Sequence, residues 1–220
     1  MENSDKISIR RLTTLALFTI AFAYIEAVVV VYLRAIFYPD GFTFPIINFL
    51  EMPGADRYVL IEIGREAATM VLMLTASWLM VSSWRHRLAY FLIIFAIWDI
   101  FYYLWLKLLL NWPSSILDWD ILFLIPITWA SPVLAPLITS LTMLLIAARL
   151  LISKTMKLTL LRTAVIAGLV LMIIVLYCLA GLRITEPDYN SCFSWPIFIT
   201  LHLAVAVLLL QSSNRKKSCK

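Results

Sequence analysis

The chain has 220 residues, of which 63% are hydrophobic and 14% are charged. This composition is typical of an integral membrane protein and excludes a soluble domain, a low-complexity chain and a disordered chain. The formal net charge is +5, but the basic residues cluster in short segments between apolar runs. That arrangement is typical of membrane-topology determinants and argues against nucleic-acid binding. The three cysteines form no CxxC pair, so the sequence offers no zinc or redox motif.

Six apolar segments are each near the length of about 17–25 residues that a helix needs to cross a bilayer. We therefore predict an all-α polytopic bundle, formed by a single integral membrane domain over residues 1–220. The first apolar run follows basic residues, as in a signal peptide, but it is too long for a signal h-region and predicts a retained helix. The predicted spans are Leu12–Leu33, Tyr58–Val81, Leu88–Leu110, Pro132–Leu151, Thr163–Leu182 and Trp195–Gln211.

The distribution of basic residues predicts the orientation. Thirteen of the 18 lysines and arginines lie before the first span, after the second, from Arg149 near the end of the fourth to Arg162 before the fifth, and after the last. Basic connections face the cytoplasm, so both termini are predicted to be inside. Short connections and this strong bias favour a bacterial inner membrane. The size and six-span layout resemble those of small bacterial membrane proteins, including substrate-binding subunits of modular vitamin transporters, and the resemblance assigns no residue roles.

The segment Trp119–Trp129, before the fourth span, is predicted to be an interfacial or re-entrant piece. A helix that began at Asp120 would extend about 48 Å, well beyond the hydrocarbon core. Pro126 breaks such a helix before the span begins at Pro132. This segment and residues 35–57 are rich in aromatic side chains. Two interpretations fit these aromatic residues, namely a belt at the membrane interface or a lid over a cavity.

Charged residues within the predicted spans are the strongest functional indication in the sequence. Glu62 and Glu66 lie one helical turn apart on the second span, and Arg65 lies three residues from Glu62 on nearly the same face. A charge at mid-membrane costs at least about 2.5–3.5 kcal/mol on insertion scales, so such residues are rare and usually functional. Glu26 on the first span lies at a similar depth, and Asp99 on the third lies near the middle of the bilayer. We predict that these residues line one outward-facing polar cavity.

Three further residues complete the predicted ligand-binding set. Tyr103 and Lys107 lie one and two turns above Asp99, and His202 lies in the outer half of the sixth span. Four acidic and two basic side chains would leave this layer at about minus two if all were ionised, which predicts that protons or a bound cation complete the site. The alternative interpretation is a closed network of ion pairs that only fixes helix packing.

Asp118 and Asp120 form an Asp-x-Asp pair that is a candidate divalent metal site, because hard cations prefer carboxylate oxygens. The alternative is a helix start, where aspartate is favoured by the helix dipole. The sequence contains no Gly-rich phosphate loop, HExxH, GxSxG or ExxH motif, and no cofactor is predicted.

Three classes of function stay open at this point. The first is a small binding or transport protein for a cation, a proton or an amine-bearing solute, acting alone, as a homo-oligomer or with a partner subunit. The second is an intramembrane enzyme acting on a lipid or lipid-linked substrate at the outer leaflet, with Glu66 or Asp99 as general base and Arg65 or Lys107 holding a phosphate. The third is a structural or assembly subunit. The first ranks above the second because no recognisable catalytic motif is present.

Overall fold

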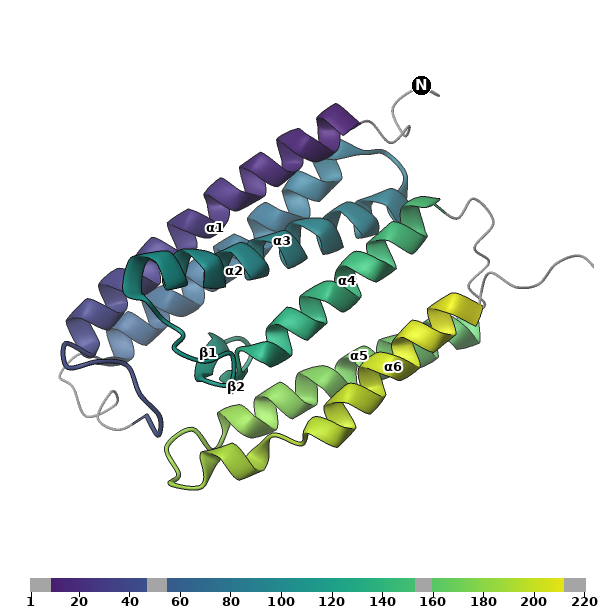
Figure 1. Ribbon diagram of the computed structural model, residues 1–220. Helices are drawn as coiled ribbons and strands as arrows, with labels where there is room; N and C mark the ends of the chain where they lie inside the picture. Colours follow the sequence, from purple (N-terminus) through teal and green to yellow (C-terminus); the bar gives the residue numbers. More distant parts are fainter. Residues whose placement is uncertain (1–8, 47–54, 153–159, 212–220) are drawn as a thin grey trace, which may run out of the picture.

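The computed structural model describes residues 9–46, 55–152 and 160–211. Within these ranges six long helices follow one another, with a two-stranded sheet before the fourth and a short 3-10 helix, η1, before the sixth (Figure 1). The elements are α1 (Ile9–Phe37), α2 (Ala55–Met80), α3 (Trp84–Leu110), β1 (Trp119–Phe123), β2 (Trp129–Pro132), α4 (Leu134–Ile152), α5 (Leu160–Gly181), η1 (Tyr189–Cys192) and α6 (Trp195–Gln211).

Each predicted span coincides with one of these helices, and the prediction of a helical membrane bundle is confirmed at that level. Within the described residues, α1, α3, α4, α5 and the segment Tyr189–Leu209, which contains most of α6, are long and apolar enough to cross a membrane. The helix α2 is long enough to cross a membrane but is not among these apolar helices, and it carries the charged residues Glu62, Arg65 and Glu66. The number of six crossings therefore stays a prediction.

Helix α4 joins two groups of helices. α3 packs against α1, α2 and α4, whereas α6 packs against α4 and α5. One buried apolar cluster includes Met73, Tyr90 and Ile94, a second includes Tyr177 and Phe198, and a smaller third joins Ala89 of α3 to Ala147 and Leu150 of α4. Figure 1 shows α4 running between the two groups, with the sheet at the end of the bundle that lies opposite the start of α1. The end that carries the sheet is called the hairpin end below.

The segment before α4 forms an antiparallel β-hairpin, in which Trp119 pairs with Pro132 and Asp120 with Ser131. This finding adds a two-stranded hairpin to the predicted all-α bundle and gives the predicted interfacial or re-entrant piece the form of a defined pair of strands. Pairing the strands satisfies backbone groups that are enclosed between helices, which a broken helix at Pro126 would leave unbonded. The helix α4 begins at Leu134 rather than at the predicted Pro132, because Pro132 is the last residue of β2.

The hairpin is held in place by a close approach of α5. A Cβ atom at Gly181, the last residue of α5, would lie 1.9 Å from the carbonyl oxygen of Thr128 in the hairpin turn. Glycine therefore lets the end of α5 contact the turn backbone directly. Nearby, the Ile46 amide donates a hydrogen bond to the Ile184 carbonyl at 2.7 Å, which joins the connections after α1 and α5.

Candidate functional site

A cavity of about 820 Å³ lies between the helices and the hairpin. Five carboxyl groups line it, together with two guanidinium groups, so full ionisation would leave the lining at minus three. The acidic residues come from three helices and the hairpin: Glu26 of α1, Glu62 and Glu66 of α2, Asp99 of α3 and Asp120 of β1. The structure thus places the predicted acidic residues around a single cavity and adds Asp120 to them.

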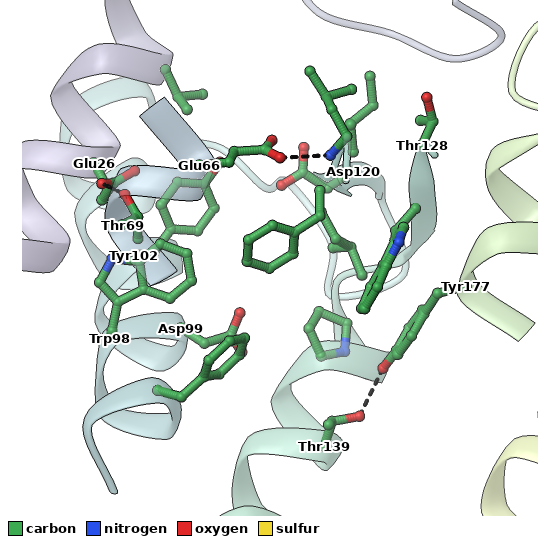
Figure 2. Close-up of a pocket in the computed structure, with 18 of the residues that line it drawn as sticks. Glu26, Glu66, Thr69, Trp98, Asp99, Tyr102, Asp120, Thr128, Thr139 and Tyr177 are labelled. Carbon is green, nitrogen blue, oxygen red and sulfur yellow. Dashed lines mark hydrogen bonds between the residues drawn. The ribbon is translucent and has the colours of Figure 1, made fainter. Parts of the chain in front are cut away.

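Arg65 forms an ion-pair cluster that connects α2 to α1. Its guanidinium group contacts the Glu26 carboxylate through Nη1, and its Nε donates a hydrogen bond to Glu62 Oε1 at 2.8 Å. The Thr69 hydroxyl donates a second hydrogen bond to Glu26, at 2.5 Å from Oε1, and Figure 2 shows these two side chains together. Since both acids have a cationic partner, this part of the cavity wall matches a closed network that fixes helix packing.

Glu66 and Asp99 form no ion pair among the described residues. The Leu124 amide of the hairpin donates to Glu66 Oε2 at 2.8 Å, and the Ser140 hydroxyl of α4 donates to Asp99 Oδ2 at 2.7 Å. Both acidic residues are buried, at 6% and 8% exposure, and Figure 2 shows them on the α2–α3 side of the cavity. A buried carboxylate without a cationic partner is costly, so these two positions are where a proton or a cation would complete the site.

Arg34 forms a second buried ion pair, which the sequence analysis missed. Its Nη2 lies 3.0 Å from Asp120 Oδ1. The guanidinium carbon also lies 3.7 Å from the ring centroid of Trp112 and 4.1 Å from that of Phe42, in cation–π geometry. Arg34 thereby links the end of α1 to the hairpin and to two connections. The available sequence signal was a basic residue directly after the predicted first span and beside an aromatic-rich connection, but its partners are distant in sequence.

Aromatic side chains from three connections pack against one another at the hairpin end of the cavity. The ring of Phe42 contacts that of Trp112, and the ring of Phe44 contacts those of Trp119 and Tyr189. Phe42 also lines the cavity itself. Mutual packing over a cavity is what the lid interpretation requires, whereas belt residues would face the lipid.

Tyr103 and Lys107, both predicted from α3, occupy different places. Tyr103 is buried, lines the cavity and lies beside Asp120. Lys107 is exposed and does not line the cavity. Its ammonium group donates to the carbonyls of Pro113 at 2.8 Å and Asn111 at 3.3 Å, so it binds the connection that follows α3.

His202 lies on the far wall of the cavity in a network that joins α4, α5 and α6. The Thr139 hydroxyl oxygen lies 2.7 Å from the Tyr177 hydroxyl and 3.1 Å from His202 Nε2. His202 Nδ1 lies 2.9 Å from the Phe198 carbonyl oxygen, so both ring nitrogens have hydrogen-bond partners. Figure 2 shows Thr139 and Tyr177 opposite Asp99. Thr139 and Tyr177 were not among the predicted site residues, because a hydroxyl on an apolar helix is not distinctive in sequence.

Asp118 and Asp120 face different surroundings. Asp120 lines the large cavity, whereas Asp118 lines a separate, smaller cavity at the surface of the hairpin end. The Asp118 carboxylate accepts hydrogen bonds from the Ser114 and Ser115 amides at 2.7 and 3.1 Å. Burial raises the pKa of Asp118, but these hydrogen bonds and that of the Ser114 hydroxyl outweigh it and lower the pKa below its usual value. The predicted metal pair is thus not assembled here, and in the described ranges no three His, Cys, Asp or Glu residues converge on one point.

Comparisons with protein-family models, with curated proteins and with solved structures find no match to this chain. An assignment of function therefore rests on the geometry of the cavity.

Proposed function

We propose that this is a six-span protein of a bacterial inner membrane, with both termini inside, that binds and transports an amine-bearing or other cationic solute. The start of α1, with Arg10 and Arg11, the start of α3, with Arg85 and Arg87, and the end of α4, with Arg149, lie at the end opposite the hairpin, which supports a cytoplasmic location for that end. The hairpin end then faces outward. The packed rings of Phe42, Phe44, Trp112, Trp119 and Tyr189, called the aromatic cap below, lie at the same end of the cavity.

The observation that carries this proposal is the pair of buried carboxyl groups, Glu66 and Asp99, that face one cavity and form no ion pair within the described part of the chain. There each accepts one hydrogen bond from a neutral protein donor, whereas Asp120 is paired with Arg34, and Glu26 and Glu62 with Arg65. A cation in the cavity would compensate the two unpaired groups in the way that arginine compensates the others.

The remaining cavity wall favours an organic cation over a bare metal ion. The cavity volume of about 820 Å³ is in the usual range for small-molecule sites. Aromatic residues from both sides line it, among them Trp98, Tyr102, Trp129 and Tyr177. Aromatic faces attract alkylammonium groups within about 6 Å of the ring centroid, whereas a metal ion needs several oxygen ligands.

The proposal is tested by thermal unfolding of the purified protein in a neutral detergent, with a panel of amines and inorganic cations. A ligand at about 100 times its Kd adds about 2.7 kcal/mol of stability, which corresponds to a rise in Tm of about 5–10 °C for a chain of this size. We expect at least one organic amine to produce this rise in the parent and to lose most of it in Glu66→Gln and in Asp99→Asn. Glu186→Gln is the matched control, since Glu186 is exposed and outside the cavity.

Uptake of the identified amine into proteoliposomes then tests the transport step. If no cation changes Tm in the parent, and both carboxamide variants only alter the stability of the unliganded protein, the acidic residues serve helix packing and the proposed function is wrong.

A further inference from the structure

The cavity has a polar part and an apolar part, separated along the helix axes. Glu26, Glu66 and Asp99 each lie eleven residues from the hairpin-side end of their helices, but these ends are not level. Figure 2 shows Glu26 and Glu66 at the height of Asp120 in the hairpin and Asp99 deeper, toward Thr139. Glu62, Arg34 and Asp120 lie nearer to the hairpin end. Asp99 is therefore the deepest charged residue of the lining, and the other charged side chains, Arg65 among them, lie on its hairpin side.

The other helices can be aligned with this level through their hydrogen bonds. Ser140 is bonded to Asp99, so this part of α4 lies level with the boundary. Thr139 in turn contacts Tyr177 of α5 and His202 of α6, which places those residues at the same level. Lining residues farther from the hairpin end than these belong to the apolar part of the cavity.

The apolar part extends along α3 from Asp99 to Phe91, a distance of about 12 Å. Among the described residues its polar groups are the hydroxyls of Thr69 and Thr142, which are already bonded to Glu26 Oε1 at 2.5 Å and to the Ile138 carbonyl at 3.0 Å. The apolar side chains come from five helices and include Met70, Phe91, Leu92, Met143, Ile146, Ile174 and Val205. A small, fully hydrated cation would make no use of this space, because it offers only apolar contacts.

We propose that the ligand is a cationic amphiphile, with an alkylammonium head group at Glu66 and Asp99 and an aliphatic chain in the apolar part of the cavity. This inference rests on the proposed function and specifies the class of its ligand. The head group is opposite in charge to Glu66 and Asp99, and the chain matches the apolar walls of Met143, Ile146 and Ile174.

In this proposal the ligand enters from the bilayer between helices α2 and α5. Both contribute lining residues, but among the described residues α2 packs on α3, and α5 packs on α6, η1 and β2, without an extensive interface between α2 and α5. A chain already dissolved in the membrane therefore reaches the apolar part of the cavity without crossing the aromatic cap.

The test measures equilibrium binding of radiolabelled decyltrimethylammonium to the full chain in nanodiscs, with empty nanodiscs as background. Three unlabelled competitors are used, namely decyltrimethylammonium, tetramethylammonium and decyl sulfate. Each methylene group moved from water to apolar surroundings strengthens binding about fourfold, but a long chain also partitions into lipid. Decyl sulfate has the same chain with the opposite charge and controls for that partitioning.

Two variants fill the apolar part of the cavity, Ile174→Trp and Met143→Trp. Leu171→Trp is the matched control on the same helix as Ile174, because Leu171 is 60% exposed and does not line the cavity. We expect each filling variant to lower the affinity for decyltrimethylammonium at least tenfold and to leave the affinity for tetramethylammonium unchanged. The control Leu171→Trp should retain the parent's affinity for both cations. Retained binding of tetramethylammonium also shows that a variant has folded, and a second filling variant is available if one does not fold.

The results distinguish this inference from the proposed function. If Asp99→Asn lowers the affinity for both cations while the filling variants alter neither, the cavity binds cations and the assignment of a chain-binding part is wrong. If decyl sulfate competes as well as decyltrimethylammonium, the site does not recognise the charged head group, and the amphiphile need not be cationic. If neither cation binds above the background, the proposed function fails together with the inference.

Discussion

Replacing Gly181 with alanine should displace the β-hairpin from α5. The added Cβ would lie 1.9 Å from the Thr128 carbonyl oxygen, 2.6 Å from its carbon and 3.2 Å from the Trp129 amide nitrogen. All three atoms belong to the backbone, so no side-chain rotation relieves the contact. Ordinary contacts begin at 3.4 Å, so the end of α5 and the hairpin turn must separate by about 1.5 Å.

The cost of this shift can be bounded. Introducing a methyl group into a well-packed interior costs about 1–3 kcal/mol, and a chain of this size loses about 2–4 °C in Tm for each kcal/mol. We therefore expect Gly181→Ala to lower Tm by about 2–12 °C. The hairpin carries Asp120 and Leu124, which contact Arg34 and Glu66, so the same shift should weaken ligand binding at Glu66.

Gly168→Ala is the matched control for this experiment. Gly168 lies on the same helix with no atom within 4 Å of an added Cβ, and alanine is the better helix former by about 1 kcal/mol. Thermal unfolding of both variants, followed by circular dichroism in one detergent, should show a lower Tm only for Gly181→Ala. Equal Tm values for the two variants would refute the contact between α5 and the hairpin turn.

Two further predictions concern groups at the hairpin end. Arg34→Gln leaves Asp120 buried without its cation and should lower the free energy of unfolding by about 3–5 kcal/mol. Adding Asp120→Asn should recover part of that loss. A double-mutant cycle on Tm measures the coupling, and strictly additive effects would show that the pair is not coupled. Asp118→Asn should cost about 1 kcal/mol at neutral pH through weakened turn hydrogen bonds. The pKa of Asp118 is lowered in the folded chain, so its contribution to the free energy of unfolding is present above the unfolded-state pKa of about 3.9. This contribution is lost as the pH falls through the folded-state pKa. The parent and the variant should therefore differ in Tm at neutral pH and converge at low pH.

The sequence by itself determined the class of the protein and the position of its helices along the chain. Runs of about 20 apolar residues leave few alternatives to membrane helices, because in lipid the backbone must satisfy its own hydrogen bonds. It also predicted that Glu26, Glu66 and Asp99 face one cavity from three different helices, because charged residues within spans are seldom exposed to lipid. The structure places all three on one cavity wall.

Only the tertiary structure decided which charges are paired. Arg65 lies between two glutamates in sequence, yet it pairs with Glu62 and with Glu26 of another helix, whereas Glu66 turns to the hairpin amide of Leu124. The strand pairing after α3 could not be predicted either, because a hairpin with nine strand residues and Pro126 between its strands has the composition of an irregular interfacial segment. Helical periodicity gives the depth and face of a residue within its own helix, but partners on other helices depend on how the helices are arranged around the bundle, which no local pattern encodes.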